Sequence, residues 1–181
     1  MKKSILAFAL LIATSAAFAQ KKTTTSGSVS FDATTSSDAL PKADNKTAIA
    51  SLDTKTGAVA FETVIKNFTF SNPKIQEHFN GATWMDSDKF PTATFKGKLT
   101  NPAAVNFKKD GTYTADVEGD LTLHGITQKV KTTATFVVVG KKVTSTSAFT
   151  IKLEDYKVEG GAIAAGKVSK EPKITVSAEF K

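Results

Sequence analysis

The chain contains two histidines, His78 and His124, the side chains best suited to acid–base catalysis or metal binding near neutral pH. They lie far apart in the sequence, and the chain has no cysteine to complete a zinc site with them. A serine nucleophile would need a G-x-S-x-G elbow and a phosphate site a full G-x-x-x-x-G-K-[ST] loop, and neither pattern occurs. We therefore predict a protein that is not an enzyme and that uses no cofactor and no metal. A hydrolase that depends on His124 is the enzymatic alternative.

His124 lies in the stretch Gly119–Val130, which reads GDLTLHGITQKV. Leu121 and Leu123 alternate with polar residues before it, the pattern of a strand with one buried face. His124 falls on the polar side of this alternation and is followed at once by Gly125, a residue that favours turns. We interpret His124 as a loop residue between two strands.

The strand before this loop carries carboxylates at alternate positions, which would suit a cation: Asp116, Glu118 and Asp120. Lysines on the following strand provide a different explanation. If His124–Thr127 forms the loop, Thr122 lies opposite Lys129. Asp120 then lies opposite Lys131, also on the outer face. Opposite charges across two strands stabilise a sheet modestly, so we predict ion pairs here rather than a cation site.

The first residues predict the compartment. Two lysines precede the apolar run Ile5–Ala13, and Ala17-Phe18-Ala19 supplies the small residues that a signal peptidase requires. The run is too short to span a bilayer, so we predict no stable membrane insertion. We expect a signal peptide at 1–19, a single mature domain at 20–181, and export to the periplasm or beyond.

The charge of the chain suggests a solvated surface. All 24 basic residues are lysine, against 17 acidic residues, for a formal net charge of +7. Proteins that bind nucleic acids usually rely on the planar fork of arginine, so we predict no nucleic-acid partner. The sequence leaves open whether the protein forms a homodimer.

Period-2 alternation of apolar and polar residues recurs along the chain and predicts strands. Examples are Val59–Ile65, Ala93–Leu99 and Tyr113–Leu123. One apolar face and one polar face, repeated many times, describe an antiparallel sheet curled around its own interior. We predict an all-β fold, an antiparallel lipocalin-like β-barrel of about eight strands with one short helix. An immunoglobulin-like sandwich is the alternative.

Helical character is confined to the segment Ser71–Gly81. Either Ser71 or Asn72 can cap the helix, Pro73 suits its first position, and Gly81 can end it.

The aromatic composition is unusual, with thirteen phenylalanines against one tryptophan and two tyrosines. Most of this aromatic surface therefore has no hydrogen-bonding group. The rings either fill the core or, in an eight-stranded barrel, line a cavity for one apolar ligand. The pattern alone does not separate these two interpretations.

Strand parity selects the residues expected to line such a cavity: Val29, Phe31, Val59, Phe61, Phe95, Val117, Leu121, Phe136, Phe149 and Ile151. Aromatic residues that flank the predicted helix are expected to shape one mouth of it: Phe68, Phe79, Trp84 and Phe90.

Three stretches carry a family resemblance. The segment His78–Phe95 joins the predicted helix to a strand that opens with Phe90-Pro91-Thr92-Ala93-Thr94-Phe95. Gly119–Val130 forms a hairpin signature. The closing strands contribute Phe149–Ile151, Asp155–Val158 and Ile174–Val176. Together these stretches resemble the YceI-like family of exported, lipocalin-like barrels, over about Gly27 to Lys181.

The resemblance implies the fold and a ligand, an apolar polyisoprenoid chain such as that of a respiratory quinone, held inside the barrel. It also implies that His124 belongs to a fold signature with no catalytic role. Family members that hold an isoprenoid usually carry, after the first strand, a longer segment rich in glycine and aromatic residues. Thr34–Lys46 is instead polar and lacks aromatic residues, which predicts a shorter or differently covered barrel with a smaller cavity.

Two functions follow from these observations. The first is a non-enzymatic lipid-binding protein that holds a polyisoprenoid or quinone-like ligand. The second is an envelope interaction or stress-tolerance module whose barrel is filled by its own side chains.

Overall fold

The computed structural model describes residues 20–181, and the predicted signal peptide at 1–19 lies outside the described residues. The strands are β1 (Lys21–Asp32), β2 (Lys42–Asp53), β3 (Ala58–Val64), β4 (Thr69–Phe70), β5 (Thr92–Leu99), β6 (Gly111–Leu123), β7 (Ile126–Val139), β8 (Lys142–Thr150) and β9 (Lys173–Phe180). The helices are α2 (Pro73–Asn80) and α3 (Gly161–Ala164), with 3₁₀ turns at Ile65–Asn67, Pro102–Ala104 and Leu153–Tyr156. Within residues 20–181, no helix has the length and apolar character needed to cross a membrane.

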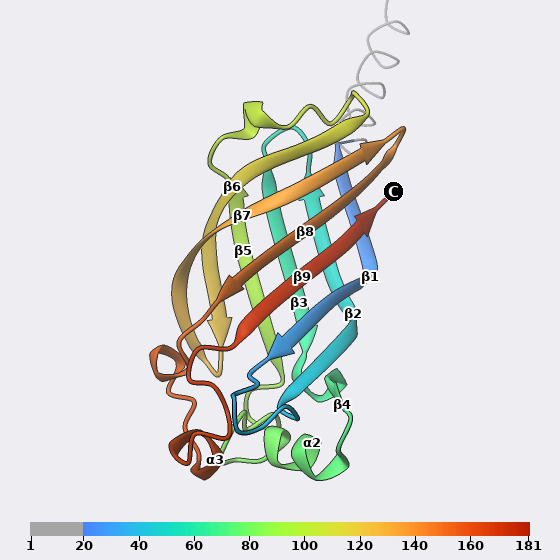
Figure 1. Cartoon of the computed structure of the whole chain (residues 1–181). Coiled ribbons are helices and arrows are strands. Elements are labelled where there is room, and N and C mark those ends of the chain that lie inside the picture. Colours follow the sequence, from blue (N-terminus) through green and yellow to red (C-terminus); the bar gives the residue numbers. More distant parts are fainter. Residues whose placement is uncertain (1–19) are drawn as a thin grey trace, which may run out of the picture.

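Eight of the strands close into an antiparallel barrel (Figure 1). Their order is β1-β9-β8-β7-β6-β5-β3-β2, and β2 pairs with β1 to complete the ring. The short β4 is an additional strand that pairs with β2. The predicted all-β, lipocalin-like barrel is therefore confirmed. The immunoglobulin-like sandwich is wrong, because a sandwich consists of two separate sheets.

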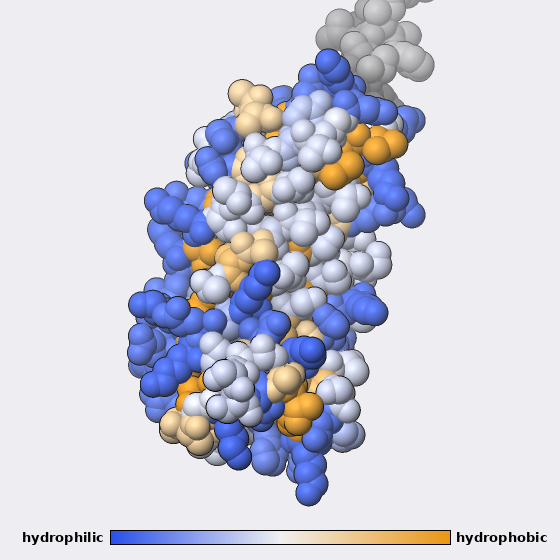
Figure 2. Space-filling view, in the orientation of Figure 1, coloured by the Kyte–Doolittle hydropathy of each residue, from blue (hydrophilic) through white to orange (hydrophobic). Residues whose placement is uncertain are grey.

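Alternation along each strand separates the interior from the surface, as β7 illustrates. Ala134, Phe136 and Val138 are buried, whereas Thr133 and Thr135 are exposed. The same rule holds around the ring because successive residues of a strand point to opposite faces of the sheet. Figure 2 shows the result on one face of the molecule, where hydrophilic residues predominate and apolar residues form small separate patches.

Helix α2 begins and ends where the sequence predicts. The Asn72 side chain caps it by accepting a hydrogen bond from the backbone N–H of Lys74 at 2.9 Å, and Pro73 is its first residue. The backbone N–H of Gly81 donates to the carbonyl of Glu77 and ends the helix. These caps satisfy backbone groups that a short helix would otherwise leave unpaired.

Part of the polar segment Thr34–Lys46 belongs to the barrel itself. From Lys42 onward it forms the start of β2, which pairs with β1 and β4. The remainder is a loop closed by a 2.9 Å hydrogen bond from the N–H of Ala33 to the carbonyl of Pro41. At this end the barrel is covered by α2 and by α3, a four-residue helix that the sequence did not predict (Figure 1).

The hairpin between β6 and β7 has a shorter turn than predicted. Leu123 pairs with Ile126, so His124 and Gly125 alone form the turn. Both have positive φ, 52° and 74°, as a type I′ hairpin turn requires. A loop shorter by two residues shifts the register by two, which changes each predicted pair but keeps it on the same face.

Two of the three carboxylates of β6 pair with lysines in this corrected register, whereas Asp116 accepts a hydrogen bond from the side chain of Asn101 at 3.3 Å. Asp120 lies opposite Lys129 rather than Lys131, with 2.9 Å between Oδ1 and Nζ. Glu118 takes Lys131, at 3.3 Å. Both pairs are largely or partly solvent-exposed and contribute little to stability, but they account for Asp120 and Glu118 without a bound cation.

Two inward-facing glycines allow a close approach of strands. Gly97 on β5 and Gly119 on β6 lie opposite each other, and the ring of Phe95 covers both. Its Cζ atom lies 2.7 Å and 2.6 Å from the positions that a Cβ atom would take on Gly97 and Gly119. A Cβ atom on Gly119 would also lie 2.5 Å from the backbone oxygen of Lys96. Glycine is required here because neither strand leaves room for a side chain.

We expect Gly119→Ala to destabilise the protein by about 1–3 kcal/mol, the usual cost of overpacking an interior. The new methyl group would meet backbone atoms of β5, which cannot turn aside as a side chain does. Gly161→Ala is the matched control, because a Cβ atom there meets nothing within 4 Å. Urea denaturation followed by circular dichroism measures both, and equal transition midpoints for the two variants would contradict this account.

Candidate functional site

The buried apolar residues form two separate clusters instead of one continuous core. The first lies at the end of the barrel that carries the helices and is centred on Phe79. The Phe79 ring centroid lies 4.9 Å from that of Phe70 and 5.8 Å from that of Phe31. The second lies toward the other end and includes Phe136 and Phe180. We call them the helical-end cluster and the far cluster.

A cavity of about 140 Å³ lies between the two clusters. Its wall includes Phe79 from the helical-end cluster and Phe136 and Phe180 from the far cluster. Along β6 the wall runs from Val117 to Leu123, about 20 Å at 3.4 Å per residue. A small volume spread over such a length describes a narrow channel, which suits a single extended carbon chain.

Twelve of the fourteen residues predicted from strand parity and helix position line this cavity. They are Val29, Phe31, Val59, Phe61, Phe68, Phe79, Phe95, Val117, Leu121, Phe136, Phe149 and Ile151. The alternation identifies the inward-facing residues of β1 because this strand is regular from Val29 onward. Its register shifts relative to β2 lie before Val29, so the later residues keep their alternation.

The other two predicted residues, Trp84 and Phe90, lie outside the cavity wall. Trp84 packs edge-on against Phe79, with 5.5 Å between ring centroids, and lines a different pocket between α2 and α3. Phe90 lies over Gly125, with its ring 4.5 Å from that of His124. Neither residue belongs to a strand, so strand parity carried no information about where its side chain points.

The sequence analysis missed the hydroxyl side chains on the wall: Thr63, Thr94, Thr132, Ser145, Thr146 and Ser147. Thr63 and Ser145 are only 7% and 8% exposed. Thr63 shares the inward parity of Phe61, and Ser145 that of Phe149. The alternation that selects Phe61 and Phe149 therefore selects these two hydroxyls as well, and only the expectation of an apolar wall leaves them out.

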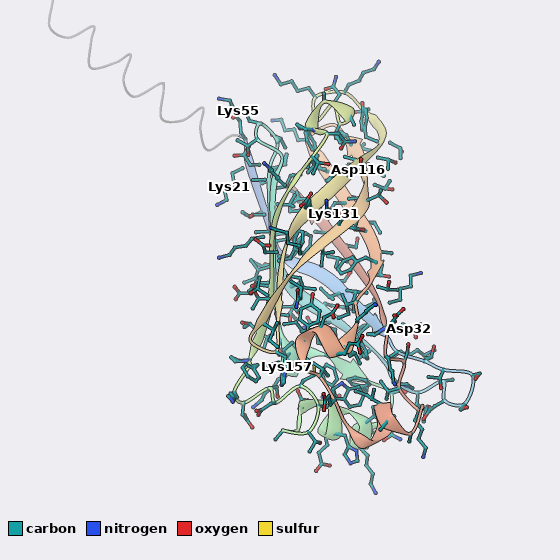
Figure 3. All side chains as sticks on the ribbon, turned by 90° about the vertical axis from the view of Figure 1, so that its left-hand side faces the viewer. Lys21, Asp32, Lys55, Asp116, Lys131 and Lys157 are labelled. Carbon is teal, nitrogen blue, oxygen red and sulfur yellow. The ribbon has the colours of Figure 1, made fainter. Side chains whose placement is uncertain are left out.

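Charge is nearly absent from the cavity wall. Over the part of the chain that the structure describes, Glu62 is the one ionisable side chain on the wall, and it is exposed. Figure 3 shows Lys21 and Lys55 on the outside of the barrel, and Lys131 is exposed as well. No group of three or more potential metal ligands gathers anywhere in residues 20–181. What the cavity offers a ligand is van der Waals contact and neutral hydrogen bonds.

His124 is a loop residue, as predicted, and it connects two parts of the helical end. Its Nδ1 atom lies 3.0 Å from the carbonyl oxygen of Tyr156, in the 3₁₀ turn that follows β8. Burial raises the pKa of Tyr156 to about 12. The contact joins the hairpin turn to the 3₁₀ turn and lies apart from the cavity wall.

Strands β7 and β8 separate part-way along their length (Figure 1). We call this place, where Thr132 and Thr133 lie near Ser147, the seam. Their ladder ends at the pair Ala134 and Ser147, although both strands continue. Beyond it the Ser147 hydroxyl donates to the carbonyl of Thr133 at 2.7 Å, and the hydroxyls of Thr132 and Ser147 lie 3.0 Å apart. Thr132 and Ser147 line the cavity and are partly exposed. Side-chain hydrogen bonds thus replace the backbone ladder where the cavity reaches the seam.

Comparison with known proteins identifies the family to which this barrel belongs. The YceI-like domain matches residues 11–180. The chain belongs to the YceI-like family. A UPF0312 protein of Pseudomonas fluorescens is 43% identical over 65 residues, which are 36% of this chain and 32% of that protein. A UPF0312 protein of Pseudomonas putida is 33% identical over 90 residues, 46% of this chain and 43% of that protein. The chain thus matches less than half the length of each of these relatives.

Solved structures resemble this YceI-like protein over most of its length. A polyisoprenoid binding domain from Saccharophagus degradans, implicated in plant cell wall breakdown, has a TM-score of 0.74 at 12% identity. The likeness covers 90% of this chain and 98% of that one. BcnA of Burkholderia cenocepacia has a TM-score of 0.72 at 20% identity, over 86% of this chain and 96% of that one. At such low identity these two likenesses establish the fold alone.

We expect His124→Val to destabilise the protein by about 1–3 kcal/mol, because a β-branched residue is strained at positive φ. His124→Asn is the matched variant, since asparagine tolerates the left-handed conformation. Thermal unfolding of both variants separates the backbone effect from loss of the imidazole. Equal melting temperatures would show that steric strain at this position is unimportant.

Proposed function

We propose that this YceI-like protein is a non-enzymatic lipid-binding protein that holds one apolar chain, of polyisoprenoid or quinone-like type, inside its barrel. The narrow apolar cavity between the helical-end and far clusters is the observation that carries the proposal. Protein interiors are normally close-packed, and a void deprives its lining of contacts. An apolar ligand would restore those contacts.

The structure from Saccharophagus degradans supports the ligand class. That protein is described as a polyisoprenoid binding domain, and its fold matches almost the whole barrel. The hairpin and closing strands of the sequence resemble the same family. Since the identity is 12%, the ligand class is an inference for this chain.

Burial of the chain could supply the affinity. Each buried methylene contributes about 0.8 kcal/mol, so three or four five-carbon units would give a gross term above about 10 kcal/mol. Association and ordering of the ligand remove a large part of this term. A micromolar dissociation constant, which corresponds to about 8 kcal/mol, is attainable without any ion pair.

The volume of the cavity limits what can enter. An engineered cavity of about 150 Å³ in another protein accommodates benzene. This cavity, at about 140 Å³, is similar in volume but extends along several residues of each strand. It would therefore admit one slender chain of several five-carbon units only if side chains of the wall move apart, while a bulky ring would have to remain outside.

The alternative function expected from the sequence, an interaction or stress-tolerance module with a filled barrel, loses its main argument. That hypothesis required the inward side chains to meet in the middle, whereas the two clusters are separated by a cavity.

We expect protein purified from its own host's envelope to carry an isoprenoid adduct, and delipidated protein to bind farnesol with micromolar affinity. Native mass spectrometry and isothermal titration calorimetry measure these two outcomes. Ala93→Phe should weaken binding at least about tenfold, because Ala93 lines the cavity and a phenyl ring there would fill part of the channel.

Lys98→Phe is the matched control for this variant. It adds the same ring to the same strand, at an exposed position on the outer face. Binding should be unchanged in this control. A folded wild-type protein that repeatedly carries no lipid and takes up no isoprenoid would overturn the proposal, and equal loss of binding in both variants would show that the cavity is not the site.

We further propose export with removal of residues 1–19. The charged start, the apolar run and Ala17-Phe18-Ala19 support it. N-terminal sequencing of protein from fractionated cells should find Gln20 as the first residue, in the envelope or the medium. Protein that retains Met1 and stays with cytosolic markers would refute export. Light scattering of the same sample distinguishes a monomer from the homodimer that the sequence leaves open.

A further inference from the structure

The cavity wall contains a hydroxyl group without a partner. Thr63 lies on the inward face of β3, is 7% exposed and lines the cavity. Its Oγ1 atom is buried and forms no hydrogen bond within the described part of the chain. An unpaired buried hydroxyl is destabilising, and such groups are uncommon in native proteins. Valine has nearly the same shape and would avoid this destabilisation, so the presence of the hydroxyl indicates a function.

The neighbours of Thr63 are already engaged or apolar. Asn45 of β2 is buried beside the end of β3, where its Nδ2 donates to the carbonyl of Val64 at 2.9 Å. Its Oδ1 accepts from the backbone N–H of Thr47, also at 2.9 Å. On the other side, Ala93 is the cross-strand partner of Thr63 and has no polar side-chain atom. Neither side chain offers the hydroxyl a partner, and the cavity that Thr63 lines is where a ligand could bring one.

We infer that Thr63 binds a single neutral oxygen atom of the ligand, a hydroxyl or carbonyl group carried by the apolar chain; this inference rests on the proposed function. A charged head group does not fit, because residues 20–181 contribute no cationic side chain to the wall and burying an unpaired charge is very unfavourable. The staggered positions of the threonine side chain lie about 120° apart, so one rotation about χ1 moves Oγ1 to the position of the methyl group and the methyl group to that of the hydrogen. A single oxygen atom is also small enough to fit the narrow channel.

The test compares farnesol with the hydrocarbon in which hydrogen replaces its hydroxyl group. Thr63→Val should weaken farnesol binding about five- to tenfold, the effect of one hydrogen bond, and leave hydrocarbon binding unchanged. Thr63→Ser should keep the preference for farnesol. Thr135→Val makes the same chemical change at an exposed position on β7 and should alter neither affinity. Removal of the unpaired hydroxyl should also raise the melting temperature of the ligand-free protein, by about 2–4 °C.

Equal effects of Thr63→Val on both ligands, or no effect on either, would overturn the inference. If this variant does not fold, the wild-type protein decides the question. It should favour farnesol over the hydrocarbon at least fivefold, about 1 kcal/mol, after correction for partition between water and alkane. No such preference would refute a role for Thr63. A wild-type protein that binds neither ligand would instead refute the proposed function.

Discussion

A closed ring of backbone hydrogen bonds is the constraint on which the rest of this molecule depends. Eight antiparallel strands around one axis leave an interior of a width that side chains only just fill. Here the apolar side chains gather into the helical-end and far clusters, and the space between them is a narrow channel. The chain has no cysteine, so stability must come from this ring and from burial of its inward face.

The helical end shows how local sequence signals support the ring. Asn72 and Pro73 start α2 in the right place, and one helix therefore carries Phe79 into the centre of an aromatic group. That ring contacts others from β1 and β4, so the helix covers the barrel and closes one end of the channel. A short helix of this kind is stable through tertiary packing more than through its own propensity.

Most of the fold follows from sequence periodicity, because a two-residue period fixes which side chains face inward. The same period explains why twelve of the predicted residues lie on the cavity wall. Turn lengths were harder to predict, since the two-residue turn depends on His124 adopting a left-handed conformation that few residues other than glycine and asparagine favour. Trp84 and Phe90 lie in irregular segments without periodicity. The hydroxyl of Thr63 was overlooked because an unpaired group is visible only when all its neighbours are known.

The seam between β7 and β8 has a kinetic consequence. Proteins open locally with free energies that range from almost nothing to the full stability of the fold. A stretch of wall held by side-chain hydrogen bonds of Thr132 and Ser147, in place of a backbone ladder, is expected to open at a lower free energy than the paired strands around it. Local opening at the seam would let a bound ligand leave between β7 and β8 while the other strands stay paired. The residence time of a ligand and the thermal stability of the fold would then depend on different interactions. Each could change during evolution without the other.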